Sequence, residues 1–290
     1  MIFLLLSILS STAIYALFKL FKNWGVNSFQ AIVSNYFVAS GFGFLIAANH
    51  GTIEVETTFP WLPFALGVGV IFISMFYLMS KSSQINGVSI TGLATKMSLL
   101  IPVAYFVVFD PDEALTSRKA VGILLGIAAL ILATTPKKGT ENWRKNLTLP
   151  LIIFLGSGLL DLFLAYVEKH FLVRDGHHEW FTPIPFGIAF IIGVIALIVR
   201  KYTQGIGIDL KSSLAGIVLG LVNYGSIYFL LKVLGSGILD RSTVIPLNNM
   251  GVVTASALIG IFAFHERMTR LNMVGIGLSI VSIAILSQLW

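Results

Sequence analysis

The chain carries ten runs of about twenty mostly apolar residues, and short polar segments separate them. A helix of about twenty residues crosses the roughly 30 Å hydrocarbon core of a bilayer. Inside that core each segment must satisfy its own backbone hydrogen bonds, which favours helices. The pattern therefore predicts an all-α polytopic membrane protein with ten transmembrane helices, at 2–21, 30–48, 61–80, 87–109, 119–135, 149–170, 180–199, 212–232, 242–264 and 271–289.

Composition excludes several other classes of protein. Hydrophobic residues make up 56% of the chain and charged residues 11%, against roughly 25% charged residues in soluble domains. Strands of a membrane barrel would alternate in polarity instead of forming continuous apolar runs. The net charge of +6 is scattered over short loops, so we expect no nucleic-acid partner. The absence of cysteine excludes disulfides and thiol catalysis.

The two halves of the sequence resemble each other. The longest internal polar break, PKKGTENWRKN, leaves five predicted helices on each side and suggests repeats at 1–136 and 149–290 with a linker at 137–148. An offset of 153 residues places Val121-Gly122-Ile123 on Val274-Gly275-Ile276, and Glu113 on Glu266. Because five is odd, the second copy would enter the membrane from the opposite side, giving two inverted five-helix repeats with a binding site near the midplane. Coincidence among apolar helices is the alternative.

The last loop of each half carries a family resemblance. Residues 112–123, DEALTSRKAVGI, and 264–277, FHERMTRLNMVGIG, each place an acidic and a basic residue before a glycine-containing helix. This arrangement resembles the end of a repeat in EamA-type transporters of the drug/metabolite transporter superfamily. The resemblance implies a secondary carrier, not an enzyme, without a cofactor. It implies alternating access and small substrates such as amino acids.

Lys96 lies near the middle of the fourth predicted helix, where a lysine is disfavoured by roughly 2.5–3.5 kcal/mol. Such residues usually face the interior of a helix bundle or a water-filled path. We expect Lys96 to contact an anionic substrate or to exchange a proton during transport. A structural lysine paired with carbonyls or with one acid is the alternative.

Asp161 is the acid placed deepest in an apolar run. An unpaired carboxylate there would take up a proton instead of remaining charged. We hypothesise that Asp161 approaches Lys96 in at least one conformational state, as a charge partner or as the acceptor of a coupling proton. The alternative is a protonated side chain that is hydrogen-bonded between helices.

Four more polar residues are candidate substrate contacts. Asn248 and Asn249 follow Pro246 and precede Gly251, and this sequence predicts an interrupted ninth helix with freed backbone groups. Asn223 and Tyr224 lie in the eighth predicted helix. Hydrogen bonding between helices is the alternative for the asparagines, and an interfacial aromatic belt for the tyrosine.

The remaining expectations concern the orientation in the membrane, the type of membrane, metal binding and rival functions. Loops with odd numbers hold twelve of the 19 Lys and Arg residues, which predicts that both termini lie outside the cytoplasm. We expect the bacterial cytoplasmic (inner) membrane, and a retained first helix because no basic residue precedes it. His170, His177 and His178 show no dependable metal-ligand spacing, so no metal is predicted. An intramembrane enzyme, a channel and a structural subunit are the rival functions.

Overall fold

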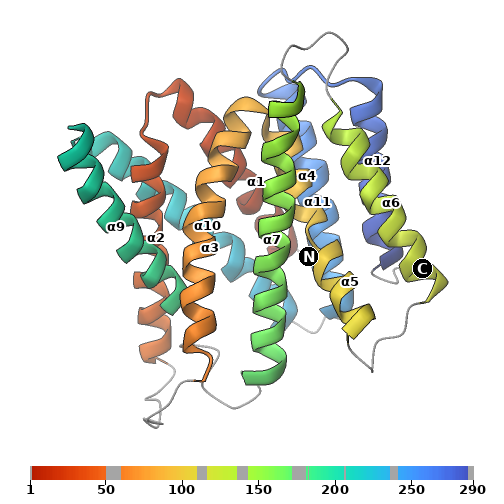
Figure 1. Cartoon of the computed structure of the whole chain (residues 1–290), viewed down its shortest axis with the longest axis horizontal. Coiled ribbons are helices and arrows are strands. Elements are labelled where there is room, and N and C mark those ends of the chain that lie inside the picture. The colour runs from red at the N-terminus through yellow and green to blue at the C-terminus, as the bar shows by residue number, and fades with distance from the viewer. Residues whose placement is uncertain are drawn as a thin grey trace. The chain divides into compact units, whose positions relative to one another are not determined.

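The computed structural model describes residues 2–49, 60–109, 116–135, 143–171, 181, 183–205, 207–235 and 241–286. Within these ranges every regular element is a helix (Figure 1). The helices are α1 (Ile2–Asn23), α2 (Ser28–Asn49), α3 (Leu62–Ile85), α4 (Val88–Met97), α5 (Leu100–Phe109), α6 (Ser117–Thr134), α7 (Trp143–Phe171), α9 (Pro183–Gln204), α10 (Leu210–Gly235), α11 (Arg241–Phe262) and α12 (Arg270–Leu286).

Within the described residues, eight segments are long and apolar enough to cross a membrane, and α4 with α5 counts as one of them. Apolar helices of shorter length cover 247–262 and 270–286. The chain is therefore a multi-pass integral membrane protein, and its helices follow the predicted runs. The ends differ most at α7, which begins at Trp143, and at α3 and α9, which continue to Ile85 and Gln204. The extension of α3 is polar but packed, because Ser82 and Ser83 are buried and Gln84 donates to the carbonyl oxygen of Phe18 at 3.0 Å.

The fourth predicted helix is broken in two (Figure 1). Residues 98 and 99 form a turn between α4 and α5. Pro102 has no N–H to donate to the carbonyl of Ser98, four residues earlier. The N–H of Ile101 donates to that carbonyl instead, at 2.9 Å, and the Ser98 hydroxyl donates to the carbonyl of Thr95 at 2.6 Å. Local bonds of this kind satisfy groups that a continuous helix would have paired.

The helices are divided between two compact units. Unit 1 comprises Met1–Leu20, Leu78–Leu159 and Gly225–Trp290, and unit 2 comprises Phe21–Tyr77 and Leu160–Tyr224. Each unit draws on both halves of the chain. In unit 1, Leu4, Val233 and Val244 form a small apolar cluster, whereas in unit 2 the corresponding cluster centres on Trp61 and Phe181.

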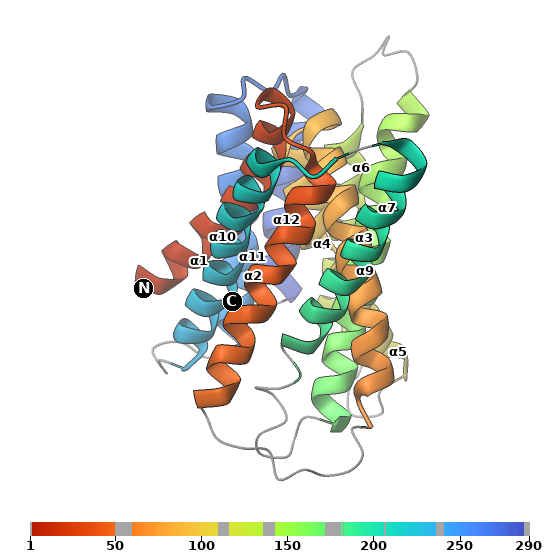
Figure 2. The same ribbon diagram turned by 90° about the vertical axis from the view of Figure 1, so that its left-hand side faces the viewer.

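In unit 2, α2 and α9 lie side by side and run antiparallel (Figure 2). Near one end of the pair, a Cβ on Gly43 would lie 2.8 Å from the Cβ of Pro183. Near the other, a Cβ on Gly193 would lie 2.5 Å from a methyl group of Val33. Small residues thus let the two backbones approach closely, as is usual for helices that associate in lipid.

In unit 1, α6 and α12 also pack antiparallel (Figure 1). A Cβ on Gly122 would lie 2.7 Å from Leu286, and the carbonyl oxygen of Gly122 accepts a hydrogen bond from the Ser282 hydroxyl at 2.7 Å. At the opposite end of the pair, Gly275 lies directly against Ala133 and near the carbonyl oxygen of Ala129. A third antiparallel pair, α4 with α11, places Gly92 against Ser256.

Candidate functional site

Lys96 lies in the last turn of α4, just before the break in this membrane-crossing segment, and it is partly buried. Its helix is otherwise well packed, since Thr91, Gly92, Leu93, Ala94 and Met97 are all buried. The C-terminal end of a helix carries partial negative charge from its last carbonyl groups, which stabilises a nearby cation. The break therefore places a negative helix end and a lysine together in the fourth span.

Asn248 and Asn249 lie on α11, the helix that packs against α4 in the same unit. Asn248 is 3% exposed, and its Oδ1 has no hydrogen-bond donor among the residues that the structure describes. Asn249 is partly buried. A buried amide oxygen without a donor is costly, and it is a place where a ligand hydroxyl or a water molecule would bind favourably.

The predicted interruption of the ninth helix is wrong, because α11 runs without a break from Arg241 to Phe262. Pro246 comes early in this helix, so the missing N–H affects the carbonyl of Ser242, near the helix start. Pro102 comes later in its apolar run and affects a carbonyl well inside it. The break occurs in the fourth span for this reason.

Asn223 and Tyr224 belong to the part of α10 that lies in unit 2. The Asn223 side chain donates to Oδ1 of Asn35 on α2 at 3.1 Å, and Tyr224 stacks on Phe42 with ring centroids 5.2 Å apart. Both contacts join α10 to α2, and the Asn223 contact fits the alternative of hydrogen bonding between helices. Asp161 is also in unit 2, whereas Lys96, Asn248 and Asn249 are in unit 1.

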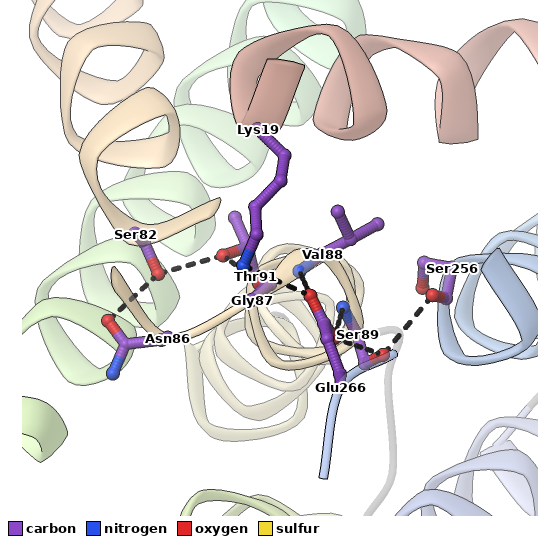
Figure 3. Close-up of polar contacts among 9 residues, drawn as sticks. All are labelled: Lys19, Ser82, Asn86, Gly87, Val88, Ser89, Thr91, Ser256 and Glu266. Carbon is purple, nitrogen blue, oxygen red and sulfur yellow. Dashed lines mark hydrogen bonds and ion pairs between the residues drawn. The ribbon is translucent and has the colours of Figure 1, made fainter. Parts of the chain in front are cut away.

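A second polar cluster surrounds Glu266, in the turn between α11 and α12 (Figure 3). Oε1 accepts a hydrogen bond from the backbone N–H of Val88 at 2.6 Å. Oε2 accepts from the backbone N–H of Ser89 at 3.3 Å and from its hydroxyl at 2.8 Å. Lys19 of α1 completes the cluster, with Nζ 3.5 Å from Oε1.

The Glu266 cluster borders a cavity of about 220 Å³ in unit 1. Its lining combines polar groups with apolar side chains: Lys19, Ile85, Asn86, Gly87, Ser89, Ile90, Leu93, Ala133, Glu266, Arg267, Met268, Asn272 and Ile276. The ends of α1, α3 and α11 and the starts of α4 and α12 meet here, which places the cavity toward one membrane face.

From the sequence, Glu266 was placed only in the resemblance at the last loop of the second half. The partners of Glu266 are far away in sequence, so no local pattern identifies them. One signal was present, because Gly87 directly precedes an apolar helix and carries no side chain that could cap it. His177 and His178 lie outside the described residues.

Comparison with known proteins finds relatives at low identity, several of which are named for glucose uptake. No protein-family model matches it. An uncharacterized protein of Haemophilus influenzae is 28% identical and matches over 97% of this chain and 95% of its own length. A probable glucose uptake protein, GlcU, of Priestia megaterium is 27% identical over 80% of each chain, and one of Bacillus cereus is 23% identical over 76% of this chain.

One solved structure has the same fold over nearly the whole chain. It superposes with a TM-score of 0.60 and covers 98% of this chain and 99% of its own, at 14% sequence identity. A similarity at this identity establishes the helical fold and says nothing about the substrate.

Proposed function

We propose that the chain is a secondary transporter that carries small polar metabolites across a bacterial cytoplasmic membrane by alternating access. Sugars such as glucose are the first substrate class to test, and amino acids the second. The proposal rests on the match to proteins named for glucose uptake. The match to the Priestia megaterium protein covers 80% of this chain and 80% of that protein. The helical architecture, with polar residues inside membrane-crossing segments, supports it.

The helix pairs support an inverted repeat. If the repeats start at the first and the sixth membrane segment, α2 corresponds to α9, α4 to α11 and α6 to α12. Each of these pairs is in contact and antiparallel. A two-fold axis in the membrane plane reverses the direction of a helix, so copies that meet across the axis must be antiparallel.

The contacts of α6 with α12 are also reciprocal. A two-fold axis requires that if residue i contacts j, the copy of i contacts the copy of j. At the offset of 153 residues, Gly122 corresponds to Gly275 and Ala133 to Leu286. Gly122 lies against Leu286 and Gly275 lies against Ala133, as the axis requires. The repeated sequence and the packing therefore support the same symmetry.

Within this transporter, we propose that Lys96, Asn248 and Asn249 bind the substrate. Discontinuous helices near the midplane are the usual sites of substrates and coupling ions in carriers built from inverted repeats. The break beside Lys96 provides such an element. The amide oxygen of Asn248, which has no donor in the described part of the chain, provides an acceptor for a substrate hydroxyl. Asn223 and Tyr224 remain proposed contacts, and Asp161 the proposed charge partner or proton acceptor.

Counterflow into proteoliposomes tests the proposal. Vesicles preloaded with unlabelled D-glucose should transiently concentrate external labelled D-glucose, because a carrier exchanges solutes one for one and a channel does not. Labelled L-glucose reports leakage. The same assay with preloaded amino acids tests the second substrate class. In a separate measurement, the purified protein should show a higher melting temperature in the presence of the solute that it carries.

Single variants connect transport to the site. Lys96→Met and Asn248→Leu should abolish or strongly reduce counterflow, whereas Lys201→Met, at the exposed end of α9, should leave it unchanged. The double variant Lys96→Met/Asp161→Asn should be less impaired than the single changes predict if the two charges are a pair. Absence of counterflow with every sugar and amino acid would contradict the proposed function. If a ligand raises the melting temperature of the wild type and of Lys96→Met equally, Lys96 has a structural role and does not bind the substrate.

A further inference from the structure

Helix α4 is capped by a carboxylate from a distant part of the chain (Figure 3). The residue at its N-cap position, Gly87, makes no side-chain cap. The first backbone N–H groups of a helix have no partner within the helix and need an acceptor from elsewhere. Glu266 supplies it to Val88 and Ser89, so the start of α4 depends on the position of the turn between α11 and α12.

The carboxylate occupies a notch that leaves no room for side chains. A Cβ on Gly87 would lie 2.5 Å from Oε1 of Glu266, and a Cβ on Gly260 would contact Oε2 and the Ser89 hydroxyl. Two glycines and a serine thus form a seat that fits this one group. Because Glu266 belongs to the turn between α11 and α12, movement of this turn away from α4 would withdraw the carboxylate from the seat.

That turn is held in a strained conformation. His265, directly before Glu266, has a φ of 54°, in the left-handed region that favours glycine. Backbone strain of this kind costs about 1–3 kcal/mol and persists only where surrounding contacts hold it. Here the surrounding contacts are the bond from the Glu266 N–H to the carbonyl of Gly260, at 2.9 Å, and the carboxylate in its seat. Release of the carboxylate would allow the strain to relax.

Lys19 joins a third element to the same group. Its ammonium lies 3.5 Å from Oε1 of Glu266, and the two side chains are 24% and 12% exposed. The ion pair connects α1 to both the turn and α4. Lys19 and Glu266 also line the cavity, together with the apolar residues Ile90, Leu93 and Ile276. The pair therefore lies where movement of the turn would change access to the cavity.

We propose that Lys19 and Glu266 form a latch whose release widens the access of water to this cavity at one membrane face. As a step of transport, the latch rests on the proposed transporter function. Closed, the carboxylate caps α4 and pairs with α1. In the open state, Glu266 leaves the seat, the turn moves away from α4, and the apolar lining of the cavity becomes more accessible to water.

The absence of cysteine from the chain makes a direct test of opening possible. Ile90→Cys places one thiol on the cavity wall, and Lys22→Cys places one on the exposed end of α1 as the reference. The rate of reaction with a small water-soluble methanethiosulfonate reports access to each. With the latch broken by Lys19→Met or Glu266→Gln, the thiol at position 90 should react about tenfold faster, for a shift of about 1.4 kcal/mol in the closed–open equilibrium. The reference rate should not change.

A destabilising variant separates a latch from a purely structural cap. Gly25 lies in a turn at a φ of 63°, so Gly25→Ala introduces backbone strain there. No described atom of the ion pair or of other residues beyond its two chain neighbours lies within 4 Å of the added Cβ. It should lower the melting temperature without accelerating the reaction at position 90. If the rate is the same in every background, or rises equally with Gly25→Ala, the latch is overturned and Glu266 is only a helix cap.

A cross-link tests the role in transport. Lys19→Cys/Glu266→Cys, bridged by a short bis-methanethiosulfonate linker, should lose solute counterflow and regain it after reduction. Full counterflow by the cross-linked protein would overturn the latch. If the wild type carries no solute at all, the proposed function fails, while the thiol-reactivity result still decides whether the latch opens.

Discussion

The side-chain amide nitrogen of Asn272 lies 2.8 Å from the carbonyl oxygen of Ala133 and ties the start of α12 to the end of α6. The same amide donates to the carbonyls of Leu132, at 3.2 Å, and Thr135, at 2.9 Å. Its Oδ1 accepts hydrogen bonds from the backbone N–H and the hydroxyl of Thr269. One asparagine thus hydrogen-bonds to terminal backbone groups of two helices, which lack partners within a regular helix.

Replacing Asn272 should destabilise the protein strongly. Asn272→Ala removes the donor to three carbonyls and the acceptor for Thr269, and we expect a loss of about 2–3 kcal/mol. Asn272→Asp keeps the size and the acceptor but places a carboxylate oxygen against the carbonyls, so it should be at least as harmful. Thermal unfolding of the purified variants measures both. An alanine variant that melts with the wild type would mean that water replaces these bonds without loss.

Gly87 should be the least replaceable glycine of the described turns. Its φ of 102° and ψ of 164° fall in a region that is essentially restricted to glycine, and an added Cβ would meet the Glu266 carboxylate. We expect Gly87→Ala to cost about 3 kcal/mol or more, from strain and loss of the cap together. Gly25→Ala, at a φ of 63° with open space around it, should cost only about 1 kcal/mol. Equal melting temperatures for the two variants would contradict this assignment.

His265→Gly should stabilise the protein. Glycine adopts the left-handed conformation of this turn without steric cost, and the gain should be about 0.5–1 kcal/mol after its greater chain entropy. His265→Ala retains the strain and is the matched control, for which we expect no gain. A lower melting temperature for the glycine variant would show that the imidazole contributes contacts that outweigh the strain.

Asp209 should contribute stability that disappears in acid. Hydrogen bonds donated by the Ser212 side chain and backbone hold the pKa of this carboxyl below its usual value. Because the folded pKa is the lower one, the contribution is fully present above the unfolded pKa of about 3.9 and is lost as the pH falls through the folded pKa. The melting-temperature difference between wild type and Asp209→Asn should therefore shrink below about pH 4. A constant difference across the acid range would contradict the linkage.

Much of the fold followed from the spacing of apolar residues, because bilayer thickness imposes one length on every spanning helix. Helix ends were harder to predict where polar residues are buried. The predicted third helix stopped at residue 80, yet Ser82 and Ser83 pack inside unit 1 and α3 continues to Ile85. A polar run at a helix end appears the same in sequence whether water or another helix surrounds it.

The candidate site was predictable to a smaller extent. A lysine within an apolar run is recognisable from sequence as a candidate site residue, and so are two adjacent asparagines. Which of two prolines breaks its helix depends on where each helix begins, and the sequence did not settle that for Pro102 and Pro246. The pairing of Glu266 with Lys19 and the start of α4 depends on tertiary structure and could not be predicted from local patterns.

The glycine and serine contacts between paired helices determine where this chain can accept mutation. In a soluble protein the large apolar residues form the interior, and their replacement is costly. Here many of them, such as Leu124 and Ile131 of α6, are exposed on the protein surface, while Gly122 lies against a neighbouring backbone or side chain. A complete substitution map should therefore depart from the soluble pattern, with the exposed leucines and isoleucines exchanging freely and the closely packed small residues among the least tolerant.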